Sequence, residues 1–85
     1  INLSYNNISE VPANVWPSMN ALLVLDLSYN PLGDGLHTES FRSLLTLRTI
    51  ALTGTSITKP PWEALSTLSS LQYLKLNVRF YLIII

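Results

Sequence analysis

The chain has 85 residues, no net charge (five basic and five acidic side chains) and no cysteine. This length accommodates one domain at most, and a compact domain of this size buries only about 60–65% of its unfolded surface. The basic residues are scattered, which excludes a basic stripe for nucleic acid. The lack of cysteine excludes disulfide bonds within this stretch.

Apolar residues recur in one frame about every 24 residues along the chain. The clearest copy is Leu22–Leu32, which reads L-x-x-L-x-L-x-x-N-x-L. The frame begins again at Leu47 and Leu71, and counting back from the first copy places Ile1–Ile8 in it as well. Such self-similarity is the signature of a solenoid in which each repeat contributes one strand.

The first half of each repeat alternates apolar and variable residues, as a half-buried strand does. This pattern predicts strands near Ile1–Ser4, Val24–Ser28, Thr49–Thr53 and Tyr73–Asn77. Parallel strands need a crossover of about a dozen residues or more between them. The second half of each repeat supplies this crossover and forms the convex side.

Prolines and glycines shape the convex halves of the repeats. Pro12 and Pro60-Pro61 fix φ and remove N–H donors, which argues against a long helix. The central repeat is one residue longer than the next, and Gly33–Gly35 is suited to absorb that residue in a turn. We expect one or two helical turns over Thr38–Leu45, with Thr38 as the N-cap.

This pattern resembles the leucine-rich repeat in its typical 24-residue class. Ile1–Leu76 follows that class, and the three-residue gap in Pro12-x-x-x-Trp16 and in Pro61-x-x-x-Leu65 is its spacing. The chain is most similar to repeats of chaoptin-like or Toll-like ectodomains of animal cell-surface proteins. The resemblance implies an α/β solenoid, a horseshoe fragment with a parallel concave β-sheet and an irregular or short-helical convex side.

The chain is expected to be one repeat array over residues 1–85 and a piece of a longer protein. A partial repeat at 1–21 is followed by repeats at 22–46 and 47–70 and by a partial or degenerate repeat at 71–85. Arg79 falls where the central repeat has Asn30, and a buried charge there is costly. Residues 77–85 are open to three interpretations: a native repeat, the start of a membrane segment or a sequence artefact.

Asn6, Asn30 and Thr55 share one position of the frame, the asparagine ladder of the repeat. A buried amide at this position bonds backbone groups of the turns before and after it, which otherwise lack partners. We predict a structural role for these three residues.

The concave face is the default binding surface of a solenoid. Exposed tyrosines supply large, rigid contact area with one polar tip, as protein interfaces prefer. Our hypothesis is that a protein partner contacts six residues of this face, and the alternative is an ordinary solvated sheet. The six are Tyr5, Asp26, Tyr29, Thr49, Tyr73 and Lys75.

Two triplets, Asn2-Leu3-Ser4 and Asn7-Ile8-Ser9, are N-glycosylation sequons. We predict glycan on Asn2 and Asn7. Such triplets are also common by chance, so an unmodified polar residue is the alternative at each position.

No motif points to catalysis or to a metal or cofactor. His37 is the single histidine, and it is expected on a solvated polar loop with Asp34 and Glu39 rather than in a metal site. The chain has no G-x-S-x-G nucleophile motif and no glycine-rich phosphate loop. We therefore expect no enzyme activity, no metal and no cofactor.

The resemblance implies a protein-binding segment of a cell-surface leucine-rich-repeat adhesion or receptor ectodomain. Its location would be extracellular, with a protein ligand or adhesion partner, no nucleic acid and membrane attachment only through an anchor outside this segment. The alternative is an intracellular leucine-rich-repeat scaffold that binds protein partners.

Overall fold

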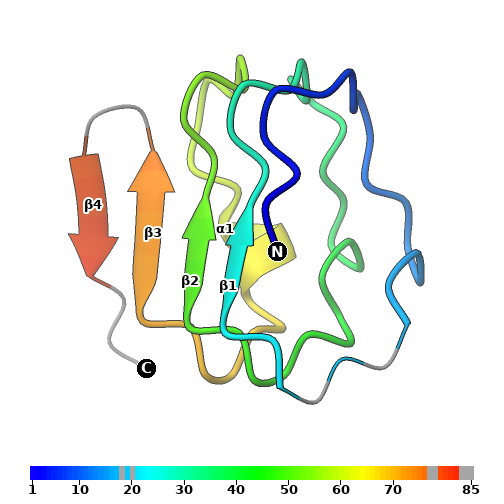
Figure 1. The fold of residues 1–85 in the computed structure, drawn as a ribbon, viewed down its shortest axis with the longest axis vertical. Coiled ribbons are helices and arrows are strands. Elements are labelled where there is room, and N and C mark those ends of the chain that lie inside the picture. Colours follow the sequence, from blue (N-terminus) through cyan, green and yellow to red (C-terminus); the bar gives the residue numbers. More distant parts are fainter. Residues whose placement is uncertain (18, 20, 77–78, 83–85) are drawn as a thin grey trace.

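The structure is a computed structural model that describes residues 1–17, 19, 21–76 and 79–82. The strands form one sheet in the order β1-β2-β3-β4. Three of them are parallel: β1 (Val24–Asp26), β2 (Thr49–Ala51) and β3 (Tyr73–Leu76). β4 (Arg79–Leu82) pairs with β3 in the antiparallel direction. Figure 1 shows the strands in a row, with β4 at one end and the N-terminal segment at the other.

The register of the sheet follows the repeat frame. Leu25 pairs with Ile50, and Ile50 pairs with Leu74, so equivalent positions of successive repeats lie side by side. The α-helix α1 (Trp62–Leu65) has only four residues and directly follows Pro60-Pro61. The three parallel strands β1–β3, the short α1 and the open sheet confirm the predicted leucine-rich-repeat horseshoe segment.

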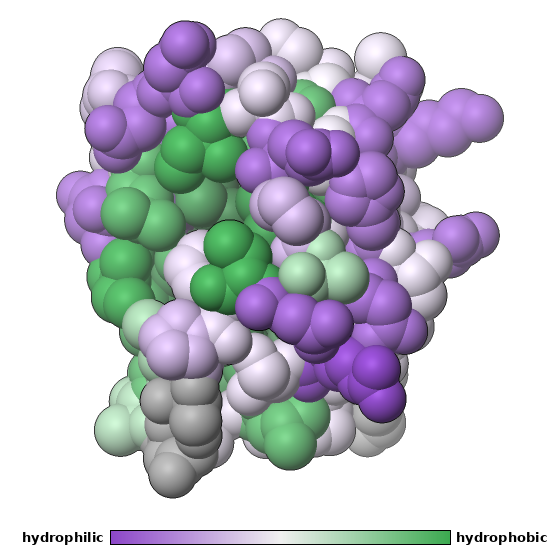
Figure 2. Space-filling model, turned by 90° about the vertical axis from the view of Figure 1, so that its right-hand side faces the viewer, coloured by the Kyte–Doolittle hydropathy of each residue, from purple (hydrophilic) through white to green (hydrophobic). Residues whose placement is uncertain are grey.

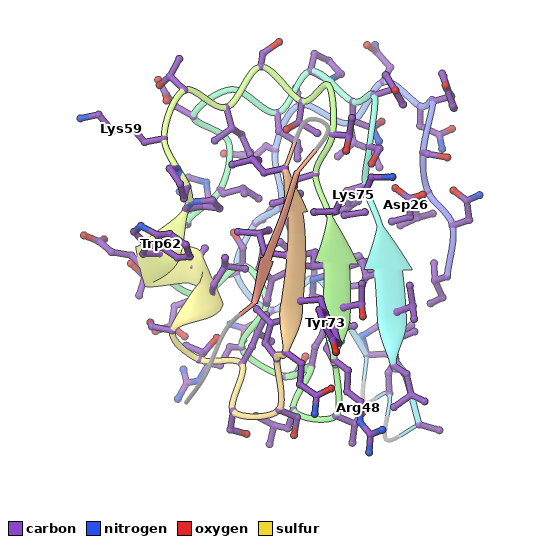
Figure 3. All side chains as sticks on the ribbon, turned by 90° about the vertical axis from the view of Figure 1, so that its left-hand side faces the viewer. Asp26, Arg48, Lys59, Trp62, Tyr73 and Lys75 are labelled. Atoms are coloured by element: carbon purple, nitrogen blue, oxygen red, sulfur yellow. The ribbon has the colours of Figure 1, made fainter. Side chains whose placement is uncertain are left out.

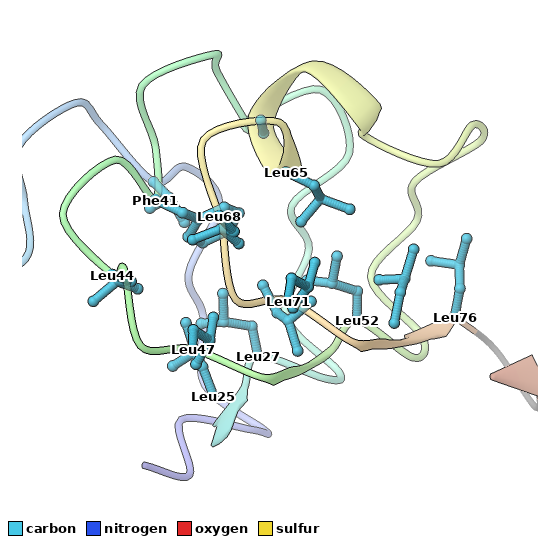
Figure 4. Close-up of a cluster of buried hydrophobic side chains, with 14 of the residues drawn as sticks. Leu25, Leu27, Phe41, Leu44, Leu47, Leu52, Leu65, Leu68, Leu71 and Leu76 are labelled. Atoms are coloured by element: carbon cyan, nitrogen blue, oxygen red, sulfur yellow. The ribbon is translucent and has the colours of Figure 1, made fainter. Parts of the chain in front are cut away.

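A single apolar core lies between the sheet and the convex segments (Figure 4). Leu25, Ile50 and Leu74 point into it from the strands, and each is 0% exposed. Phe41 and Leu65 close it from the convex side and are also buried. Burial of each such side chain contributes about 1.5–3 kcal/mol, so the repeated leucines are the main source of stability.

The N-terminal end of the solenoid leaves part of this core uncovered. Leu3, Ile8 and Trp16 are only partly buried against the core. They line a cavity of about 260 Å³ together with Val11 and Val15. Figure 2 views this end and shows hydrophobic surface beside hydrophilic residues.

Two predictions about local elements are wrong. The expected strand over Ile1–Ser4 is reduced to a single parallel bridge between Asn2 and Asp26. Thr38–Leu45 forms successive turns rather than helix, with bonds such as Leu44 N–H to the Phe41 carbonyl at 3.0 Å.

The side chain that caps these turns is Ser40 rather than Thr38. The Ser40 hydroxyl accepts from the His37 N–H at 2.7 Å and itself donates to the Val11 carbonyl of the preceding repeat. It is 0% exposed. A contact between repeats therefore takes the place of a local N-cap.

The parallel strands end earlier than predicted, although their hydrogen bonding continues into the turns. The Leu27 N–H donates to the Ala51 carbonyl at 2.9 Å, and the Tyr29 N–H to the Thr53 carbonyl at 2.8 Å. The predicted end of the last parallel strand, Asn77, lies outside the described residues. Arg79 pairs with Leu76 at the start of β4, so its backbone belongs to a strand rather than to a turn.

In the described part of the chain, no helix is long and apolar enough to cross a membrane.

Candidate protein-binding surface

Alternate residues of β1, β2 and β3 point away from the core and form rows across the sheet. One row consists of Val24, Thr49 and Tyr73, which are in register across the three strands. Val24 is 49% exposed and Tyr73 is 45% exposed, with the half-buried Thr49 between them. The row is therefore an accessible, partly apolar strip across the concave face.

The next row carries opposite charges at its two ends. Asp26, Ala51 and Lys75 are in register, so the small Ala51 side chain separates an acidic from a basic residue. Two strand spacings place the backbones of Asp26 and Lys75 about 10 Å apart. Figure 3 shows both residues on the same side of the sheet as Arg48 and Tyr73, with Lys59 and Trp62 on the opposite side.

The Asp26 carboxylate is oriented by its own strand end. Its Oδ1 accepts the Ser28 N–H at 2.9 Å, and the nearly buried Ser28 hydroxyl accepts the Thr53 N–H at 3.2 Å. The first bond holds the Asp26 carboxylate against the backbone, and the second joins the turns of successive repeats.

Tyr5 and Tyr29 lie in the turns after the strands rather than in the sheet. Both have positive φ, 56° and 59°, and they are 75% and 48% exposed. Their rings stack with centroids 4.5 Å apart and an interplanar angle of 12°. The six predicted contact residues thus fall into two groups, four on the concave sheet and a tyrosine pair at its flank.

Asn30 bonds its own turn and the preceding repeat, which is part of the predicted set of ladder contacts. Its side chain is buried, and Nδ2 donates to the carbonyls of Leu27 and Leu3 at 2.9 Å each and to that of Ser28 at 3.3 Å. Its Oδ1 accepts the Ile8 N–H at 3.1 Å. The contacts to Leu3 and Ile8 join the central repeat to the first one.

The other two ladder residues make fewer contacts. Asn6 is exposed and donates within its own repeat, to the carbonyls of Leu3 at 2.9 Å and Ser4 at 3.2 Å. Thr55 is buried and its hydroxyl donates to the Leu52 carbonyl at 2.7 Å. Among the described residues, Asn6 therefore bonds only within its own repeat, and the shorter Thr55 side chain reaches only its own turn.

Both sequon asparagines are exposed. Asn2 pairs with Asp26 in an isolated bridge at the edge of the sheet, and its Oδ1 accepts from the backbone and the hydroxyl of Ser4. Asn7 lies in the turn region that follows the stacked Tyr5.

His37 contacts the first repeat instead of Asp34 or Glu39. Its Nε2 lies 3.0 Å from Glu10 Oε2, whereas Glu39 pairs with Arg42 at 3.3 Å. Within the described residues, no group of three or more histidine, cysteine, aspartate or glutamate side chains is placed to hold a metal ion.

Two surface features are missing from the sequence prediction. Val24 is not among the predicted contact residues. It shares its position in the repeat frame with Thr49 and Tyr73, and this position indicates that its side chain faces outward. The second is a cleft beside Trp62, formed by turns of different repeats. Trp62 directly after Pro60-Pro61 is the local signal that points to a pocket here, but its second wall comes from another repeat.

Residues 21–44 match the family model described as Leucine Rich Repeat. The match covers β1 and most of the convex half of the central repeat. A search of curated proteins finds no match to the chain, and a search of solved structures finds none either. Leucine-rich-repeat domains are in general protein-binding scaffolds, and no catalytic family is indicated. Residues 21–44 are therefore a leucine-rich repeat, and the chain around them has the fold of a leucine-rich-repeat solenoid segment.

Proposed function

We propose that this chain is the protein-binding segment of a cell-surface adhesion or receptor ectodomain of the chaoptin-like or Toll-like class. In this proposal a protein partner docks on the concave face of β1–β3. The observation that carries it is the uncovered strip of Val24, Thr49 and Tyr73.

The chemistry of this face suits a protein partner. Tyr73 and Val24 offer apolar contact area, and aromatic residues are enriched in the cores of interfaces. Asp26 and Lys75 lie in the next row and supply charges of opposite sign, which favour one orientation of the partner. The strands hold these side chains in place, so little conformational freedom is lost on binding.

The two exposed sequons support a location at the cell surface. Glycan at Asn7 would project from a turn beside the sheet and would leave the strip of Val24, Thr49 and Tyr73 accessible. The alternative, an intracellular scaffold, would use the same concave face without glycan.

The docking surface is tested with a fluorescent tetramer of the chain applied to intact cells. We expect Val24→Ala with Tyr73→Ala to weaken binding about tenfold or more, because apolar anchors dominate interface energies. The control, Val15→Ala with Leu45→Ala, removes apolar side chains of similar exposure, 52% and 56%, outside the strip. Equal binding by the two double variants would refute the concave docking surface.

The location is tested on the native protein, with an antibody against this segment. We expect a membrane-impermeant biotin reagent to label the protein on intact cells and a glycosidase to increase its mobility. The Asn7→Gln variant should lose part of that shift. Protein that is neither labelled nor glycosylated would favour the intracellular alternative. That result would not contradict the proposed docking surface, which both alternatives share.

A further inference from the structure

A cleft of about 440 Å³ lies away from the concave face, between two successive repeats. One wall is the turn around Gly33, Asp34 and Leu36 of the central repeat. The other wall is the segment from Ile57 to Glu63, which includes Trp62 at the start of α1. Figure 3 places Trp62 and Lys59 on the side of the sheet opposite to Asp26 and Tyr73. The cleft is therefore separate from the proposed docking surface.

Backbone hydrogen bonds hold the two walls together. The Gly33 N–H donates to the Thr55 carbonyl at 2.9 Å and so ties the first wall to a residue that lies two positions before the second wall. The Trp62 N–H donates to the Pro60 carbonyl at 2.9 Å, and the Leu65 N–H to the Pro61 carbonyl at 3.1 Å. The two prolines restrict φ in this wall. The shape of the cleft is thus largely preformed, as in ligand sites generally.

An aromatic ring and two carboxylates line this cleft. Trp62 is 53% exposed, so its ring is accessible to a group that enters the cleft. Asp34 and Glu63 are exposed and take part in neither of the ion pairs that the described residues form. Lys59 also lines the cleft, but Figure 3 shows its side chain extended away from Trp62 and from the sheet.

We propose that this cleft binds the guanidinium group of an arginine side chain on a protein partner. A cation over the face of a tryptophan ring is attracted by the ring quadrupole, and arginine is the more frequent cation in such contacts. The planar guanidinium stacks on the ring and keeps its N–H groups free for carboxylates, which a lysine ammonium cannot do equally well. Asp34 and Glu63 supply those carboxylates from opposite walls.

The test uses NMR of the chain with ¹⁵N-labelled tryptophan, titrated with the peptide acetyl-Gly-Arg-Gly-amide. The indole signal of Trp62 should shift and saturate with a Kd on the order of 1 mM, as expected for one side chain in an open cleft. Trp16 serves as the internal control, because its indole N–H is already bound to the Ser40 carbonyl. The same peptide with citrulline, a neutral analogue of arginine, should bind clearly more weakly.

Variants that remove carboxylates distinguish binding at this cleft from a general attraction of the peptide by the net charge of the protein. Asp34→Ser with Glu63→Gln should lower the affinity for the arginine peptide by about three- to tenfold, which is the range expected for the loss of two exposed ion pairs. Glu10→Gln with Glu39→Gln removes two carboxylates elsewhere and should leave the affinity unchanged. The proposal fails if Trp62 does not respond, if citrulline binds equally well or if the two double variants weaken binding equally. None of these results bears on the concave surface.

Discussion

The ring of Tyr29 occupies the space that a side chain at Gly54 would need. A Cβ atom added at Gly54 would lie 2.7 Å from Tyr29 Cδ1. Tyr5, Tyr29 and Gly54 share one frame position and the same left-handed backbone, with φ of 56°, 59° and 65°. Tyr5 stacks on Tyr29 in turn. The missing side chain in the third repeat therefore makes room for the tyrosine of the second.

We expect Gly54→Ala to lower the free energy of unfolding by about 2 kcal/mol, because it combines left-handed strain with displacement of Tyr29. Gly33→Ala is the matched control, since Gly33 has φ of 49° but nothing within 4 Å of an added Cβ. The control should cost only about 1 kcal/mol. Urea unfolding of both variants measures the difference, and equal losses would show that the Tyr29 contact contributes nothing.

The ladder predicts unequal effects of two asparagine substitutions. Asn30→Ala would leave the buried Leu27 carbonyl and the partly buried Ile8 N–H without their side-chain partner, and the lost buried bond alone should cost about 1–3 kcal/mol. Asn6→Ala removes only exposed bonds and should change stability by about 0.5 kcal/mol or less. Thermal and urea denaturation distinguish the two, and similar losses would contradict the structural role of Asn30.

Phe41 is predicted to be the most sensitive core position on the convex side. It is 0% exposed, so Phe41→Ala should cost about 3–5 kcal/mol and unfold much of the population. Leu45 is four residues further along and 56% exposed. Leu45→Ala should therefore stay within about 0.5 kcal/mol of the parent chain. Circular dichroism against urea concentration checks both, and a mild effect of Phe41→Ala would place its ring outside the core.

The two tryptophans should respond differently to replacement by phenylalanine. Trp16→Phe removes the hydrogen bond from the indole N–H to the Ser40 carbonyl, which is 2.8 Å long and joins residues 24 positions apart. This loss should lower the free energy of unfolding by about 1 kcal/mol. Trp62→Phe keeps an exposed aromatic ring and removes no side-chain hydrogen bond that the described residues form. Its unfolding midpoint should match that of the parent chain. A larger loss of stability from Trp62→Phe than from Trp16→Phe would show that Trp62, and not Trp16, is the tryptophan that stabilises the fold.

The sequence was sufficient to predict what depends on the repeat frame alone. Leu25, Ile50 and Leu74 recur in that frame, and the register of β1–β3 follows from it. Features that depend on contacts between repeats were predicted less well. Thr38 has the local pattern of an N-cap, but the cap is Ser40, whose hydroxyl also reaches Val11 of the preceding repeat.

The candidate site shows the same division. Alternation along the strands identifies Thr49, Tyr73 and Lys75 as outward-facing residues. It does not reveal the stacking of Tyr5 on Tyr29, which depends on left-handed backbone in two turns. Nor does it reveal the cleft at Trp62, whose two walls belong to different repeats.

The side-chain hydrogen bonds that join neighbouring repeats span between 22 and 29 residues, which is about the length of one repeat. Trp16 reaches Ser40 and Thr46 reaches Leu22, each across 24 residues, and the Thr53 N–H reaches Ser28 across 25. A single extra residue can be absorbed in a turn, as in the central repeat, whereas duplicating or excising a whole repeat preserves the spacing of every such bond. The natural unit of variation in this architecture is thus a block of about two dozen residues, and a length polymorphism between related chains should occur in multiples of that block.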